Sequence, residues 1–150
     1  MNNRSESRVA EANRRRAQPF SWPIRVYYED TDSGGIVYYA NYLKFMERAR
    51  TEWLRALGFT QHDLAARAGV LFVVRSLAID YVKPSRFDDS LQVSVEPVKV
   101  GAGQIMVAQE VRRAAETLAS AKVLLACVNA ATLRPVRIPQ AVLIKTGTIS

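Results

Sequence analysis

The chain has 150 residues, of which 49% are hydrophobic and 23% charged, and this balance is typical of one soluble globular domain. Its net charge of +7 is compatible with polyphosphate ligands, nucleic acid, an acidic carrier protein or anionic lipid. A single cysteine and a single histidine exclude an intrachain disulfide and the usual cysteine–histidine zinc site, and they weaken any Ser-His-Asp interpretation. No metal or cofactor is implied by these residues.

Residues 1–19 are predicted to form a flexible basic arm. They hold five arginines and two glutamates but few bulky apolar side chains, so burial cannot offset the entropy of ordering. The segment lacks the apolar region of a secretory signal, and no stretch of the chain approaches the length of a membrane-spanning helix. We therefore expect a cytoplasmic protein without a transmembrane segment, in which any membrane association is peripheral.

The folded domain is expected to span residues 20–140. It begins with a strand over residues 24–28, where β-branched and aromatic residues alternate. A loop rich in turn formers covers residues 29–35, and helical spacing follows from residue 36 to residue 57. Gly58 marks the end of this helix. The predicted buried stripe of the helix consists of Tyr42, Phe45, Met46, Ala49, Trp53, Ala56 and Leu57.

A short helix from about residue 61 to residue 68 is predicted next, with Thr60 as its N-cap. The apolar period then changes to two, and four strands are predicted at residues 71–81, 90–100, 104–113 and 118–129. Residues 141–150 are expected to form a loose C-terminal tail. A long helix followed by an antiparallel meander is an α+β arrangement, in which the sheet covers the helix.

The chemistry is expected in the loop before the long helix. Asp30 and Asp32 place carboxylates in a segment that leads directly into a helix start, where unpaired backbone N–H groups and a partial positive charge are available. Gly34 and Gly35 permit sharp turns and close approach of a ligand. This segment can therefore hold an acid beside an oxyanion-binding dipole, which suits acyl transfer. The same pattern is common in ordinary helix capping, so the residues alone leave both interpretations open.

A thioester is the acyl compound that fits this sparse set of groups. A thiol has a pKa of about 8.5, so it leaves with little help from a general acid. One carboxylate and an oxyanion site can then suffice in a chain that is poor in histidine and cysteine. An ester or an amide would require more catalytic groups than the sequence offers.

Two stretches of the chain carry a family pattern. The first consists of Tyr28-Glu29-Asp30-Thr31-Asp32, Gly34-Gly35, Val37-Tyr38, Asn41-Tyr42 and Phe45-Met46-Glu47-Arg48-Ala49-Arg50. The second consists of Phe72-Val73-Val74-Arg75-Ser76, Tyr81, Pro84, Arg86 and Asp88-Asp89. They resemble the YbgC-like branch of the 4-hydroxybenzoyl-CoA thioesterase family, acyl-CoA thioesterases often linked to the Tol–Pal system. The resemblance spans roughly residues 26–128 and implies a hotdog fold, with one long central helix wrapped by a mainly antiparallel sheet of about five strands.

The resemblance also implies a reaction, namely hydrolysis of acyl-CoA to a free acid and coenzyme A without a cofactor. In that reaction Asp32 is the general base or the nucleophile, and the backbone N–H of Tyr39 polarises the thioester carbonyl at the helix start. Many relatives carry His at position 39, so a side-chain role for that residue is absent or altered here. The resemblance further implies a homodimer whose sheets join, with active sites at the interface, and often a dimer of dimers.

Further contacts to the substrate are expected from Gly35, Val37, Arg75, Ser76, Lys83 and Arg86. The three cations among them are candidates for binding the phosphates of coenzyme A, although exposed Lys and Arg are also common without a ligand. Asp30 is expected to organise the loop through hydrogen bonds to nearby backbone rather than to act as a second acid. Glu47 is expected to form an ordinary ion pair with Arg50 or a neighbour across the sheet rather than to serve as an alternative base.

Two alternative functions stay open on the sequence. A hotdog protein can bind acyl-CoA or acyl carrier protein without hydrolysis, and release of free thiol from acyl-CoA distinguishes the two cases. A nucleic-acid-binding module would use the basic arm and surface. The sequence lacks the interleaved aromatic and basic residues of single-strand binders, so no nucleic acid partner is expected.

Overall fold

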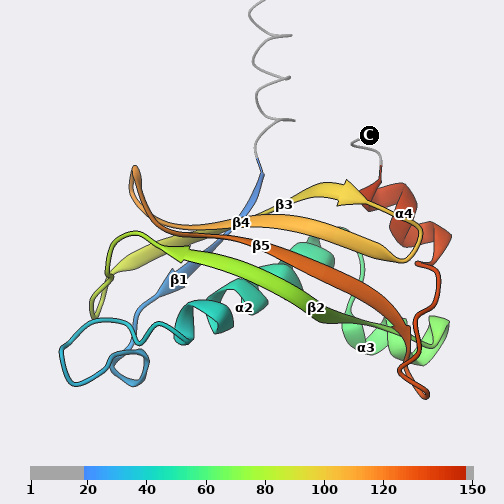
Figure 1. Cartoon of the computed structure of the whole chain (residues 1–150), viewed down its shortest axis with the longest axis horizontal. Coiled ribbons are helices and arrows are strands. Elements are labelled where there is room, and N and C mark those ends of the chain that lie inside the picture. The colour runs from blue at the N-terminus through green and yellow to red at the C-terminus, as the bar shows by residue number, and fades with distance from the viewer. Residues whose placement is uncertain (1–18, 148–150) are drawn as a thin grey trace, which may run out of the picture.

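The computed structural model describes residues 19–147, so the predicted basic arm lies outside the described residues except for its last position. Figure 1 shows a curved sheet with one long helix against it. η1 is a 3-10 helix and η2 a π-helix. The elements in chain order are β1 (Phe20–Arg25), η1 (Tyr28–Asp30), α2 (Asn41–Ala56), α3 (Gln61–Asp63), η2 (Leu64–Ala68), β2 (Val70–Tyr81), β3 (Ser90–Val100), β4 (Gln104–Arg113), β5 (Glu116–Asn129) and α4 (Gln140–Thr146).

The five strands form one antiparallel sheet in the order β1-β3-β4-β5-β2. The sheet curves around α2, as Figure 1 shows, and this confirms the predicted α+β arrangement of a central helix wrapped by about five strands. Strand β2 follows the helices in the chain but pairs with β5, which leaves β2 and β1 as the two edges of the sheet.

The core lies between α2 and the concave face of the sheet. Strand β4 alternates as predicted, with Ile105, Val107, Gln109 and Val111 all buried on one face. Helix α2 presents most of its predicted stripe to this face, although Ala56 is exposed and Leu54 is buried in its place. The buried residues of α2 are Asn41, Tyr42, Phe45, Met46, Ala49, Trp53 and Leu54.

The first strand lies earlier in the chain than the sequence predicted. It covers Phe20–Arg25 rather than residues 24–28, and Pro23 sits inside it opposite Gln92 of β3. A proline is tolerated there because β1 is an edge strand, where a missing N–H leaves no ladder partner unpaired on the outer side. Tyr28 has a high strand propensity, yet it begins the 3-10 turn η1.

The start of the long helix also differs from the prediction. Helical spacing extends back to residue 36, but α2 begins at Asn41, because Ile36 and Val37 are engaged in bridges to Arg86 and Thr31. Its predicted end is confirmed, since Gly58 adopts a φ of 99° directly after the helix.

The predicted short second helix is confirmed, together with its N-cap. The Thr60 side chain accepts a hydrogen bond from the Asp63 N–H at 3.0 Å. The helix continues as the π-turn η2, which ends at Gly69 with a φ of 68°.

The predicted loose tail is wrong for most of its length. Residues Gln140–Thr146 form α4, and within it Val142 is 0% and Thr146 is 1% exposed. A helix of seven residues after a proline is too short to show a clear apolar period, so the sequence pattern missed it. Across residues 19–147 no helix has both the length and the apolar character needed to cross a membrane.

Candidate active site

A tight hairpin follows η1 and holds Asp32. Thr31 and Val37 form an antiparallel bridge across it. Inside the bridge, the N–H of Asp32 donates to the carbonyl of Ile36 at 2.8 Å, and the N–H of Gly35 donates to the carbonyl of Asp32 at 3.0 Å. Gly35 has a φ of 78°, in the left-handed region that favours glycine. The position of Asp32 is therefore fixed by backbone geometry that this glycine permits.

The Asp32 carboxylate is exposed to solvent and held by one oxygen. Its Oδ1 accepts a hydrogen bond from the N–H of Gly34 at 2.8 Å. A Cβ at position 34 would lie 3.2 Å from this oxygen, so glycine allows the close approach. Among the hydrogen bonds and ion pairs within residues 19–147, none uses Oδ2 of Asp32. One oxygen is thus oriented and the other is open, as a general base or a nucleophile requires.

Asp30 lies in a different environment from Asp32, although both carry carboxylates in the same loop. Asp30 is only 6% exposed, and its Oδ2 accepts from the N–H of Tyr27 at 2.9 Å. Its carbonyl accepts from the N–H of Tyr38 at 3.0 Å and from Nδ2 of Asn41 at 2.8 Å. These bonds tie the start of the hairpin to the first residue of α2, which confirms that Asp30 organises the loop.

The start of α2 offers open backbone donors beside the hairpin. The first turn is closed by short-range bonds, from Tyr42 N–H to the Tyr39 carbonyl at 3.3 Å and from Leu43 N–H to the Ala40 carbonyl at 3.1 Å. In the part of the chain that is described, the N–H of Tyr39 donates to no hydrogen-bond acceptor. Such N–H groups at a helix start carry partial positive charge and can bind an anionic oxygen.

The side chain at position 39 is a tyrosine, and it lies among other tyrosines. The hydroxyl of Tyr81 donates to the carbonyl of Tyr39 at 3.1 Å, and the two rings meet edge to face at 5.8 Å. The ring of Tyr38 lies 4.8 Å from that of Tyr39. Partial burial, together with Tyr39 and Tyr42, raises the pKa of Tyr81, so its hydroxyl keeps its proton and stays a donor at neutral pH. The backbone of Tyr39 is therefore anchored from the β2 side.

Tyr42 and Ser85 add a buried polar link that the sequence pattern did not predict. The Tyr42 hydroxyl lies 2.7 Å from Oγ of Ser85 and accepts from the Ser85 N–H at 3.1 Å. The Ser85 carbonyl in turn accepts from the N–H of Val37 at 2.8 Å. Tyr42 fills the core as predicted, and the tendency of buried tyrosine hydroxyls to find partners could have indicated the link. The hairpin, α2 and the loop before β3 are thereby joined.

The predicted substrate-binding residues do not all come together. Gly35 and Val37 lie in the hairpin, and the backbone of Arg86 bridges Ile36 beside them. The exposed Arg86 side chain makes no ion pair within residues 19–147. Lys83 lies two residues after the end of β2, but its ammonium is paired with Glu116 at 3.2 Å.

Arg75 and Ser76 lie apart from the hairpin in a single chain. Both are exposed in the middle of β2, at a bulge where Ser76 faces Leu124 of β5. Arg75 lines a shallow hollow of about 690 Å³ together with Arg137 and the turn between β3 and β4. A role for these two residues at the hairpin would need a second copy of the chain.

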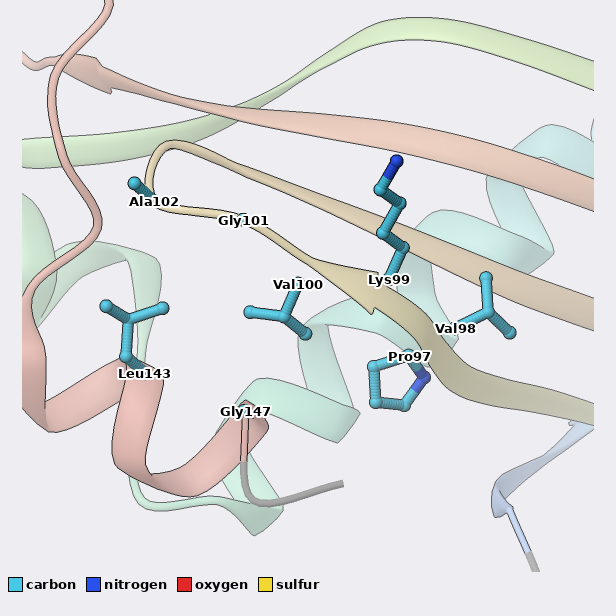
Figure 2. A pocket seen from close by; sticks show the side chains of 8 residues that line it. All are labelled: Pro97, Val98, Lys99, Val100, Gly101, Ala102, Leu143 and Gly147. Atoms are coloured by element: carbon cyan, nitrogen blue, oxygen red, sulfur yellow. The ribbon is translucent and has the colours of Figure 1, made fainter. Parts of the chain in front are cut away.

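Another hollow, of about 560 Å³, lies between α4 and the end of β3. Figure 2 shows Leu143 and Gly147 on one side of it and Val98, Lys99 and Val100 on the other. Among its lining residues within 19–147, Lys99 is the one titratable side chain, and none of them carries a carboxylate or a nucleophile. This hollow therefore lacks the groups for acyl transfer, and the hairpin is the better candidate site.

Comparison with known proteins agrees with this site. Residues 26–145 match the family described as the thioesterase-like superfamily. The chain is 48% identical over 123 residues to the acyl-CoA thioesterase YbgC of Haemophilus influenzae, covering 82% of this chain and 90% of that protein. It is 43% identical over 124 residues to the acyl-CoA thioester hydrolase YbgC of Escherichia coli O6:H1, covering 82% and 92%. The crystal structure of a probable thioesterase from Bartonella henselae matches with a TM-score of 0.78 at 34% identity, covering 81% of this chain and 100% of that one.

These relatives align over most of their own length, and the matched region contains the hairpin, α2 and four of the five strands in full. The solved thioesterase shares the arrangement of a sheet wrapped around one helix, which confirms the predicted hotdog fold. The chain therefore belongs to the thioesterase-like superfamily and, within it, to the YbgC-like acyl-CoA thioesterases that its loop and helix motifs resemble.

Proposed function

We propose that this chain hydrolyses the thioester bond of acyl-CoA, with Asp32 as general base or nucleophile and the backbone N–H of Tyr39 binding the developing oxyanion. Acyl-CoA hydrolysis is the activity in the names of relatives that are 43% and 48% identical over most of the chain, and this chain is an enzyme of that class. The observation that supports Asp32 is its exposed carboxylate, oriented by Gly34 in the hairpin before α2.

In the proposed reaction the carbonyl carbon of the thioester is attacked by water or by the carboxylate itself. As general base, Asp32 takes a proton from water while the hydroxide oxygen bonds to carbon. As nucleophile, it forms a mixed anhydride that water then hydrolyses. In both cases the C–S bond breaks, its electron pair leaves with sulfur, and the thiolate of coenzyme A gains a proton. The negative charge on the carbonyl oxygen is stabilised by N–H groups at the helix start.

The assembly we propose is a homodimer joined along β2, which can associate further as a dimer of dimers. The outer edge of β2 has no partner strand within residues 19–147. Three apolar side chains along it are exposed, Val73 by 38%, Val74 by 43% and Leu77 by 41%. An open strand edge with exposed apolar side chains favours pairing with another chain. A second β2 alongside would continue the sheet and would bring its own Arg75 and Ser76 to the interface.

We place the reaction in the cytoplasm, where a lone thiol stays reduced. Cys127 is buried and unpaired, and burial raises its thiol pKa, so it is a packing residue in this proposal rather than a second nucleophile.

The test is a thiol-release assay with short-chain, long-chain and aromatic acyl-CoA esters. Asp32→Asn keeps an oxygen that can accept from the Gly34 N–H but removes the charge, so the loop should keep its shape. We expect turnover to fall by at least ~100-fold, the scale for loss of an essential acid–base group. Asp63→Asn is the control, because Asp63 is also exposed but lies on α3. Near-normal turnover of a folded Asp32→Asn protein would remove Asp32 from the mechanism.

A further inference from the structure

Arg50 on α2 is a half-buried cation without a carboxylate partner within residues 19–147. Burial lowers the pKa of its guanidinium, and the charge of the exposed Glu47 opposes this effect. The predicted ion pair between Glu47 and Arg50 is wrong, because within residues 19–147 no carboxylate oxygen lies within 4.0 Å of Arg50. Buried arginines are normally paired, since an unpaired charge away from water is costly. A half-buried cation without such a partner favours an anionic group from outside the chain.

Gln109 holds the guanidinium in place. It is 1% exposed, and its Oε1 accepts from Nη1 of Arg50 at 2.9 Å. Its Nε2 donates to the carbonyl of Met46 at 3.1 Å and to that of Ser94 at 3.3 Å. The amide is thus fixed with its oxygen toward Arg50. Only this one of the five guanidinium N–H donors is used in hydrogen bonds within residues 19–147.

Arg50 lines a small cavity, and five of the nine described lining residues are apolar. The cavity has a volume of about 160 Å³ and lies between α2, Gln61 and the strands β2 and β5. At about 30 Å³ for each water-sized group, it has room for roughly five heavy atoms. Its apolar walls suit methylene groups and its cation suits an anion at their end. The lining residues are Glu47, Arg50, Thr51, Trp53, Leu54, Gln61, Phe72, Val74 and Leu125.

The α2 residues that line the cavity lie about two to four turns beyond the helix start that follows Tyr39. Tyr39 itself precedes the first helical residue, Asn41, by two positions, and Arg50 lies nine residues after Asn41. The Arg50 side chain points back along the helix, because Gln109 connects it to the Met46 carbonyl one turn earlier. Seven residues of rise place the guanidinium about 10 Å along the axis from Tyr39. An extended chain covers about 1.2 Å per bond, so about eight bonds span this gap.

We propose that this cavity binds the far end of the acyl group and that Arg50 pairs there with a second carboxylate. The preferred substrates would then be medium-chain acyl-CoA esters of about eight carbons whose acyl group ends in a carboxylate. This inference rests on the proposed thioesterase function and adds the class of substrate. Arg50 is the specificity-determining residue and Gln109 its positioning residue. Glu47 lines the cavity with a negative charge that weakens binding of the second carboxylate.

The test compares two substrates of equal length, octanoyl-CoA and the CoA monothioester of octanedioic acid. Wild type should show the higher kcat/KM for the octanedioic ester. Arg50→Gln should lower that value by about 10- to 100-fold, the scale of a charge-assisted hydrogen bond, mostly through KM. Its kcat/KM for octanoyl-CoA should stay within about threefold. Glu47→Gln should raise the preference for the octanedioic ester, and Arg50→Lys should retain part of it.

Calorimetry with free octanedioate and octanoate separates this inference from the proposed function. If wild type cleaves neither ester, the thioesterase proposal fails, and the cavity is judged by binding alone. Octanedioate binding that is lost in Arg50→Gln supports the carboxylate site. The carboxylate site is refuted if wild type binds octanedioate and octanoate equally well. It is also refuted if Arg50→Gln leaves the ratio of kcat/KM for the octanedioic ester to kcat/KM for octanoyl-CoA unchanged. If that ratio is unchanged but the oligomeric state shifts, Arg50 takes part in pairing between copies of the chain instead. Should Arg50→Gln fail to fold, Arg50→Lys and Glu47→Gln decide the question.

Discussion

Replacing Tyr42 by Phe tests the buried link that joins α2 to the hairpin. The substitution removes one oxygen and no carbon, so the core keeps its volume. It deletes the contact of the Tyr42 hydroxyl with Ser85 Oγ at 2.7 Å and with the Ser85 N–H at 3.1 Å. Tyr42 is 3% and Ser85 0% exposed, so water cannot replace the lost partner without a rearrangement.

The magnitude follows from two hydrogen bonds. Each contributes about 1 kcal/mol net, and leaving a buried donor unsatisfied costs about 1–3 kcal/mol, so the free energy of unfolding should fall by about 2 kcal/mol. For a chain of this size that corresponds to a drop of about 4–8 °C in the melting temperature. Urea unfolding at constant m-value and calorimetry measure the two quantities. Turnover should fall as well, because the Ser85 carbonyl holds Val37 in the hairpin.

The control is Tyr28→Phe, since Tyr28 is 76% exposed and should change stability by less than about 0.5 kcal/mol. Ser85→Ala completes a double-mutant cycle with Tyr42→Phe, and the two losses should be clearly less than additive. A loss below about 0.5 kcal/mol for Tyr42→Phe, or full additivity with Ser85→Ala, would show that the polar link does not hold the two segments together.

Two further predictions concern stability. Val142→Ala in α4 should destabilise the fold by about 2 kcal/mol, because Val142 is 0% exposed, and an effect near zero in urea unfolding would contradict the docked helix. Burial alone raises the pKa of Asp89, but hydrogen bonds from the Arg86 N–H and the Arg113 guanidinium outweigh it and hold the pKa below its usual value. Such a carboxylate stabilises the fold above its unfolded pKa, and this contribution disappears as the pH falls through the lower folded pKa. The stability difference between wild type and Asp89→Asn should therefore be largest near neutral pH and shrink in acid, and a difference that is constant from pH 7 to pH 3 would contradict it.

Periodicity predicted those elements whose side chains repeat over several turns or pleats. The bounds of β3 and β4 agree with the predictions, because alternate residues are buried in the first half of β3 and through most of β4. The pattern was less informative where strand-like bridges compete with the helical period. Residues 36 and 37 have helical spacing, but bridges to Arg86 and Thr31 keep them extended. Helix α4 is positioned by tertiary contact of Val142 rather than by a periodic stripe.

In the candidate site, too, contacts between sequence neighbours could be predicted and contacts between distant residues could not. The loop before α2 could be singled out because its glycines, carboxylates and helix start are neighbours in the sequence, and the organising role of Asp30 needed only a local hydrogen bond. The catalytic role of Asp32 stays a prediction. The partners of Arg50 and Tyr42 could not be predicted. Gln109 is 59 residues from Arg50, and Ser85 is 43 residues from Tyr42, so these contacts exist only after the sheet has wrapped the helix.

The exposure of the hairpin in a single chain favours the proposed dimer. Three tyrosines around the helix start remain open to solvent in the single chain, with Tyr38 46%, Tyr39 59% and Tyr81 45% exposed. Hydrogen bonds to a developing oxyanion gain strength when water is excluded, and an open loop does not provide this. Strand β2, which carries Tyr81 at its end, also exposes the apolar side chains of Val73, Val74 and Leu77. The proposed pairing along β2 would bury both surfaces together, so the same contact that completes the sheet would close the active site.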